Sequence, residues 1–99
     1  MNATLLDQTR ALANEKRLEI LALLKDPAQH FTVEEYDAAE GLCGLTIAER
    51  LGIAPATASA HLKVLLQAGL VTSVRIGKFT YFARRPDALG ELAEQIRTF

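Results

Sequence analysis

Two helices are predicted near the start of the chain from the spacing of its apolar residues. The first is short and contains Leu5, Leu6 and Leu12. Asn14 is suited to cap the second, because its side-chain oxygen can accept a hydrogen bond from a free N–H of the first turn. Asp26 and Pro27 are expected to end this helix. Its apolar residues recur at helical spacing, and they are Leu18, Leu21, Ala22 and Leu24.

Residues 28–44 follow no single period. Four acidic residues lie between positions 34 and 40, and glycines occupy positions 41 and 44. We interpret this segment as a loop. One helical turn is expected to begin at Thr32, because Thr32 and Glu35 have the spacing of a capping box.

Two short helices are predicted next, joined by about three residues that include a glycine. Thr46 and Glu49 repeat the capping-box spacing, so a two-turn helix is expected over residues 46–52. Pro55 is suited to the first position of the following helix, because its missing N–H would be unpaired there in any case. That helix is expected over residues 55–68, ending at a glycine. The pair describes a helix-turn-helix.

After residue 69 the sequence favours strands. Strand formers occupy residues 70–74 and 79–83, and Gly77 lies near the reversal, which predicts a β-hairpin. Pro86 is expected to begin a last helix. The expected fold is one domain over residues 1–99, mostly α and of the α+β class, with about five helices and a two-stranded hairpin. The apolar residues of the last helix are Leu89, Leu92, Ile96 and Phe99.

The second helix of the helix-turn-helix has two contrasting faces. Leucines lie on one face with Ala58, and the other carries small or short polar side chains and one cation. Such a slim face lets a helix enter a DNA major groove about 12 Å wide. The alternative is that its alanines only favour helix or pack on a neighbour. The candidate DNA-binding residues of this helix are Pro55, Ala56, Thr57, Ser59, Ala60, His61 and Lys63.

Charge is distributed unevenly, although the net charge is only -1. Residues 1–49 hold nine acidic and four basic residues, residues 50–86 hold six basic and no acidic ones, and residues 87–99 hold three acidic and one basic. An acid-free window of this length suggests an anionic partner. Within it, Arg75 and Lys78 flank the hairpin turn, where they could contact the DNA backbone or minor groove. A helix-turn-helix followed by a basic hairpin is a winged helix.

Four stretches of the chain resemble the ArsR/SmtB family of bacterial winged-helix repressors. They are ALANEKRLEILALL (11–24), LCGLTIAERLGI (42–53), ATASAHLKVLLQAGLV (56–71) and RIGKFTYF (75–82). The resemblance implies a homodimer that binds double-stranded operator DNA as a repressor and is released by an effector. It implies a near-palindromic operator with half-sites about 34 to 36 Å apart, or a multiple of this. It also implies dimerisation through the first and last helices, for which the candidates are Leu5, Leu6, Leu89, Leu92 and Ile96.

The chain departs from the family at its usual metal sites. Many metal-sensing members carry a Cys-x-Cys pair where this chain has Cys43, Gly44 and Leu45, and one thiolate does not complete a metal site. Another common site uses Asp and His on the last helix, but residues 86–99 contain no histidine. We therefore expect no metal or other cofactor, and the effector stays unknown. An irregularly spaced set in the long loop is an alternative: His30, Asp37, Glu40 and Cys43.

The sequence leaves several alternatives open. The segment 27–44 is longer than in typical family members, and it either holds an effector pocket or is a surface insertion. Cys43 is either a thiol redox switch or a buried small hydrophobe. The winged helix could instead be a protein-protein interaction module, because fold does not fix function. The sequence contains no arrangement of residues typical of a catalytic site, so an enzyme is not expected. Without an apolar span or a signal peptide in residues 1–10, a cytoplasmic protein with no membrane partner is expected.

Overall fold

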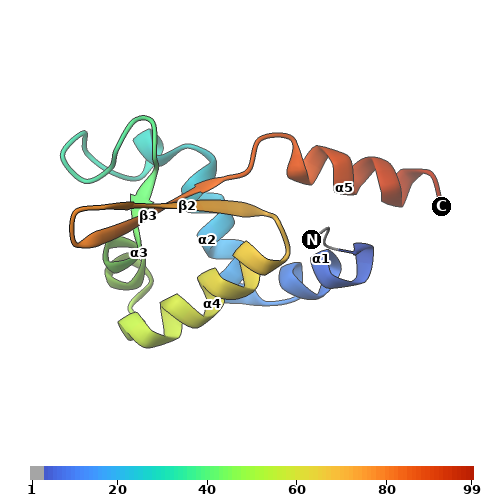
Figure 1. Ribbon diagram of the computed structural model, residues 1–99, viewed down its shortest axis with the longest axis horizontal. Coiled ribbons are helices and arrows are strands. Elements are labelled where there is room, and N and C mark those ends of the chain that lie inside the picture. The colour runs from blue at the N-terminus through green and yellow to red at the C-terminus, as the bar shows by residue number, and fades with distance from the viewer. Residues whose placement is uncertain (1–3) are drawn as a thin grey trace.

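Helices form most of the structure, and α2, α3 and α4 pack against one small sheet (Figure 1). The computed structural model describes residues 4–99; residues 1–3, part of the stretch considered for a signal peptide, lie outside them. The winged helix-turn-helix prediction is confirmed. The helices are α1 (Leu5–Leu12), α2 (Glu15–Lys25), a short 3-10 helix (Pro27–Gln29), α3 (Gly44–Leu51), α4 (Pro55–Gln67) and α5 (Ala88–Arg97). The strands are β1 (Leu42–Cys43), β2 (Val71–Ile76) and β3 (Phe79–Arg84).

Local capping fixes the start of each of the first two helices. Thr4 and Asp7 form a reciprocal capping box at α1, and hydrogen bonds from Thr4 lower the pKa of the Asp7 carboxyl group. The Asn14 side-chain oxygen accepts a hydrogen bond from the Arg17 N–H at 3.0 Å, as predicted. These caps satisfy backbone donors that the helices leave unpaired, and Asn14 begins α2 two residues after α1 ends.

The apolar pattern predicted for α2 is only partly right. Leu21 and Leu24 are buried, but Leu18 is 51% exposed and Ala22 is also exposed, while Ile20 and Leu23 are buried instead. The reason is that α2 contacts four elements, α1, α3, α4 and β3. A helix enclosed on several sides buries more than one narrow stripe, so its sequence period is not a guide to a single face.

The sheet has three strands rather than the two predicted. β1 pairs antiparallel with β3, with Leu42 opposite Phe82, and gives the strand order β1-β3-β2. A strand of two residues is too short to produce a period in the sequence, which is why it was missed. β2 runs to Ile76, further than expected, because the reversal takes only two residues, Gly77 and Lys78, with Gly77 at φ +61°; β3 gains Arg84, which pairs with Val71.

Two predicted helix starts are wrong by two residues. β1 passes directly into α3, so this helix begins at Gly44, and Thr46 lies within it rather than capping it. α5 begins at Ala88 rather than Pro86, because Asp87 adopts a left-handed conformation at φ +65° before it. The Gly52 and Pro55 predictions are confirmed: Gly52 ends α3 at φ +66°, and Pro55 occupies the first turn of α4.

The predicted helical turn at Thr32 is a simple turn. The Glu35 side chain accepts a hydrogen bond from the Thr32 N–H at 2.9 Å, which is half of a capping box, but no helix follows. Hydrogen bonds from Thr32 lower the pKa of the Glu35 carboxyl group, and the charge of Arg50 adds to this. Glu35 therefore holds a negative charge in the loop before β1.

The hydrophobic core lies between the sheet and α2, α3 and α4. Its largest fully buried side chains come from these helices and from the strand ends, and they are Ile20, Leu42, Ile47, Leu62, Leu65 and Leu70. α5 extends away from the sheet and lies near α1 (Figure 1). Within residues 4–99, no helix is both long and apolar enough to cross a membrane.

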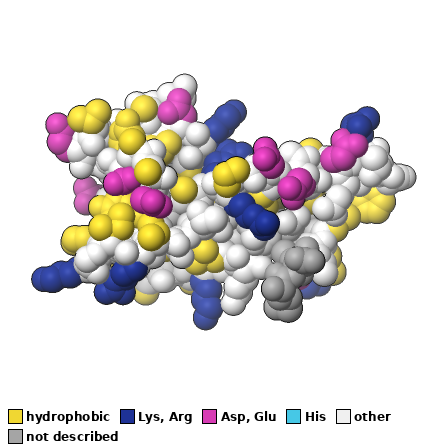
Figure 2. Space-filling view, turned by 45° about the horizontal axis from the view of Figure 1, so that its top comes forward, with side chains coloured by type: hydrophobic (Ala, Val, Ile, Leu, Met, Phe, Trp, Pro, Cys, Tyr) yellow, Lys and Arg dark blue, Asp and Glu magenta, His cyan; other side chains and the backbone are white. Residues whose placement is uncertain are grey.

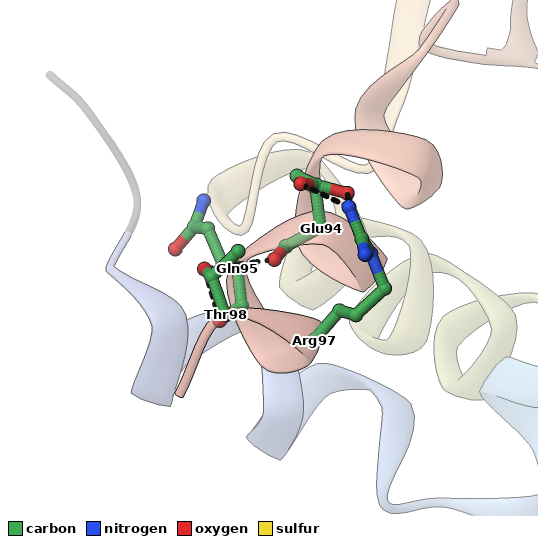
Figure 3. A network of polar contacts seen from close by, with 4 residues as sticks. All are labelled: Glu94, Gln95, Arg97 and Thr98. Carbon is green, nitrogen blue, oxygen red and sulfur yellow. Dashed lines mark hydrogen bonds and ion pairs between the residues drawn. The ribbon is translucent and has the colours of Figure 1, made fainter.

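The last turn of α5 is held by its own residues (Figure 3). Arg97 donates two hydrogen bonds to the Glu94 carboxylate from Nη2, at 2.7 and 2.9 Å, and one from Nε at 3.1 Å. The Thr98 hydroxyl donates to the Glu94 carbonyl at 3.0 Å. These contacts complete the helix without covering its apolar residues, so Ile96 and Phe99 are 48% and 91% exposed.

Candidate nucleic-acid interface

α4 has the two-faced character that the sequence predicts. Ala58, Leu62 and Leu65 are at most 1% exposed and pack into the core. The opposite face is open to solvent, and its exposed residues are Pro55, Ala56, Thr57, Ser59, Ala60, Lys63 and Gln67. Of the three alanines considered for close packing, only Ala58 is buried. We call this surface the small face of α4; among residues 4–99, its small side chains are exposed and are not packed against another element.

The first turn of α4 adds free backbone donors to the small face. Its N-cap residue, Ala54, has no side-chain oxygen and makes no capping hydrogen bond. Residues 54–57 are all exposed, so the unpaired N–H groups of this turn face solvent. Free N–H groups and the positive end of the helix dipole form a favourable environment for a phosphate.

The wing lies on the same side of the molecule as the start of α4. A groove of about 500 Å³ separates them, lined by Pro55 and Ser59 of α4 and by Lys78 and Thr80 of the hairpin. A helix entering a major groove would therefore bring the tip of the wing to the neighbouring backbone. Arg75, beside the tip, is exposed and donates from Nε to the Gly77 carbonyl oxygen at 3.2 Å.

Three of the six cations in the acid-free window are exposed beside this surface: Lys63, Arg75 and Lys78. Two others have different roles, since the Arg50 guanidinium stacks 4.0 Å from the Phe31 ring centroid and Arg84 donates to the Leu21 carbonyl oxygen. Figure 2 shows Lys and Arg side chains projecting along the lower edge of the molecule, with the visible acidic side chains lying higher. This separation leaves one edge free of visible negative charge.

His61 lies at the edge of the small face and is half-buried. Its Nδ1 is 3.2 Å from Nη1 of Arg17, on the first turn of α2. Because a guanidinium group only donates, Nδ1 must be the acceptor, which leaves the Nε2–H of a neutral ring as the available donor. Arg17 thereby sets which atom of His61 can donate toward a ligand.

Arg17 also joins α1 to α2 and was not predicted as a site residue. Its Nε donates to the Ala11 carbonyl oxygen at 2.6 Å, and its Nη2 donates to that of Arg10 at 3.1 Å. The Gln8 side chain similarly donates to the Ala68 carbonyl oxygen at the end of α4, at 3.0 Å. Since Arg17 and His61 are 44 positions apart, no local pattern in the sequence indicates their contact.

The other predicted site residues fall into different environments. Cys43 is a free, buried thiol at the junction of β1 and α3, which favours the small-hydrophobe interpretation. Within residues 4–99, no group of three or more His, Cys, Asp or Glu residues is placed to hold a metal ion, so the set from His30 to Cys43 is not gathered. Leu92 is 2% exposed and is covered by its own chain, whereas Leu6 and Ile96 are 57% and 48% exposed. Leu5 and Leu89 are half-buried.

The small face, the free N–H groups and the three cations together match the chemistry of duplex DNA. Hydroxyl groups of Thr57 and Ser59 can donate to or accept from base edges, and alanine methyl groups can contact thymine methyl groups. Lysine and arginine near the groove edges can pair with phosphates.

Comparison with known proteins agrees with this geometry. Residues 12–74 match the family model described as a helix-turn-helix domain. The chain is 43% identical, over 91 residues, to the HTH-type transcriptional regulator YbzH of Bacillus subtilis (strain 168), covering 90% of this chain and 91% of that protein.

Solved structures of similar fold include two regulators. One is a "possible transcriptional regulator for arsenical resistance", with a TM-score of 0.71 and 26% identity, covering 94% of this chain and 83% of that one. The other is the homodimeric winged helix-turn-helix DNA-binding domain of a possible ArsR-family transcriptional regulator from Mycobacterium bovis. It has a TM-score of 0.64 and 30% identity, covering 93% of this chain and 73% of that one.

Proposed function

Because this chain belongs to the helix-turn-helix transcriptional regulators of the ArsR type, we propose that it is a homodimeric repressor released from its operator by an effector. α4 enters the major groove through its small face, and the wing contacts the adjacent backbone or minor groove. The observation that carries the proposal is that the small face is exposed and lies beside the basic hairpin. A near-palindromic operator follows from two-fold symmetry.

The residues proposed to contact DNA have different roles. Ala56, Thr57, Ser59 and Ala60 approach base edges, and Pro55 positions the free N–H groups of the first turn beside a phosphate. Lys63, Arg75 and Lys78 pair with phosphates. His61 donates from Nε2, held in that tautomer by Arg17.

A DNA capture experiment tests this function. The purified protein is mixed with random genomic fragments, and the bound DNA is sequenced. We expect enrichment of a near-palindromic site, including one upstream of the protein's own gene, with affinity that falls steeply as salt is raised. Binding that enriches no sequence would contradict the proposal and favour a protein-interaction module.

Neutralising a phosphate-contacting cation is expected to weaken binding without unfolding the protein. For Lys63→Gln and Arg75→Gln we expect roughly threefold to tenfold weaker operator binding, and a slope of log affinity against log salt that falls by about one for each lost contact. Fluorescence anisotropy over a salt series measures both. Lys25→Gln, at the exposed end of α2, is the control and should leave the slope unchanged; an equal change there would mean that total charge alone matters.

Dimerisation is proposed to use the exposed apolar residues of α1 and α5. Leu6, Ile96 and Phe99 are exposed, and Leu5 and Leu89 add half-buried surface beside them. α5 extends away from the sheet and lies near α1 (Figure 1). The homodimeric state of the similar Mycobacterium bovis domain supports the proposal.

A charge placed in that surface is expected to separate the protomers. Burying an unpaired carboxylate costs several kcal/mol, so we expect Ile96→Asp to raise the dimer Kd by at least about a hundredfold. Sedimentation velocity at micromolar concentration measures the change. Val33→Asp is the control, because Val33 is 74% exposed in the loop before β1. If both variants stay dimeric, the interface lies elsewhere.

A further inference from the structure

The hairpin exposes an apolar surface on the side that faces away from the core. Val74 lies opposite Tyr81 and Ile76 opposite Phe79, and paired residues of antiparallel strands share one face. Phe82, next to Tyr81, points the other way and is buried. Val74, Ile76 and Phe79 are 37%, 43% and 45% exposed. Clustered exposure of large apolar side chains indicates a binding surface more often than scattered exposure does.

This surface continues into a groove of about 310 Å³ between the hairpin, α3 and the loop before β1. Phe79, Tyr81 and Leu45 form its apolar part, and Leu45 is 53% exposed. Carboxylates reach it from two directions, Glu34 and Glu35 from the loop and Glu49 from α3. Among residues 4–99, no lysine, arginine or histidine lines it. Figure 2 shows apolar side chains gathered at the left of the molecule with acidic side chains beside them.

The negative charge of the groove is largely uncompensated. The Glu35 carboxylate is fixed by the Thr32 N–H. Arg50 is the cation that acts on Glu35, but its guanidinium is stacked on Phe31 and does not line the groove. Within residues 4–99, neither Glu34 nor Glu49 takes part in an ion pair. A ligand that complements this site therefore carries a positive charge.

We propose that this groove binds a small organic cation that carries an aromatic or branched alkyl group. The carboxylates of Glu34 and Glu49 attract the charge, the rings of Phe79 and Tyr81 offer their faces to it, and Leu45 contacts the apolar part. The volume is at the lower end of the range for small-molecule sites. The groove borders the one between α4 and the wing, because Leu45 and Phe79 line both, but ligand binding to it can be measured without DNA.

The test uses phenyltrimethylammonium as the probe and N,N-dimethylaniline as its neutral counterpart at pH 7.5. Each is titrated into the full-length, 15N-labelled protein while amide chemical shifts are recorded. We expect saturable shifts at Leu45, Phe79 and Tyr81 with the cation, and at least about tenfold weaker binding of the neutral compound, equivalent to about 1.4 kcal/mol.

Variants test whether the cation binds in the groove or is attracted nonspecifically to negative charge and apolar surface elsewhere. Glu49→Gln and Phe79→Ala should each weaken binding at least about threefold, whereas the exposed controls Glu91→Gln on α5 and Leu18→Ala on α2 should leave it unchanged. These four side chains are exposed, so the fold is retained. Equal affinity for the two probes, or shifts spread outside the groove, would overturn the proposal.

Discussion

Replacing Gly41 with alanine is expected to destabilise the protein by at least about 3 kcal/mol. Gly41 has φ +91°, where an L side chain is strained, and an added Cβ would lie 2.0 Å from the Phe82 carbonyl oxygen. Gly41 also exchanges two backbone hydrogen bonds with Asp37, each 2.9 Å long. The backbone of the loop or of β3 would have to move, and β1, which follows directly, would lose its register.

Gly52→Ala is the matched control for this change. Gly52 also has a positive φ, +66°, but nothing lies within 4 Å of its added Cβ. The expected cost is therefore only the conformational one, about 1 to 2 kcal/mol. Urea denaturation followed by circular dichroism measures both values. If the two variants lose the same stability, the loop does not lie against β3 as the structure shows.

Replacing Ala60 with glutamate is expected to lower operator affinity by at least about a hundredfold. Ala60 is exposed on the small face of α4, so a longer, charged side chain would hold the helix out of the groove and repel phosphates. The free energy of unfolding should change by no more than about 0.5 kcal/mol, since surface substitutions in helices are tolerated.

The control adds the same charge to another helix. Ala22 is exposed on α2, so Ala22→Glu tests whether an extra acid anywhere weakens binding. Electrophoretic mobility shifts on one operator fragment compare the two variants, and urea denaturation verifies their folding. Equal losses of affinity in the two variants would show that the small face has no special role in DNA binding.

The sequence predicted a helix or strand correctly where each face of that element carries side chains of one kind. α4 could be predicted because its leucines and its small residues lie on opposite sides, and the hairpin because strand formers flank Gly77. The winged helix-turn-helix and its exposed face followed from these two segments. The capping by Asn14 and the end of α3 at Gly52 are local signals of the same kind.

The features that were missed depend on contacts between distant segments. β1 is two residues long and exists because Leu42 and Cys43 meet β3 about 40 positions later. That strand, in turn, starts α3 early and leaves Thr46 inside it. The contact of Arg17 with His61 and the burial of Leu92 likewise depend on tertiary packing, which the spacing of residues along one helix does not contain.

Methylation interference on the captured operator tests most directly whether α4 binds in the major groove. Dimethyl sulfate methylates guanine N7, an acceptor on the major-groove edge, so a methyl group there obstructs a helix in that groove. We predict that methylation at guanines in two segments, centred about one helical turn apart or a multiple of it, prevents binding. Binding that tolerates N7 methylation at every guanine of the site would contradict the account.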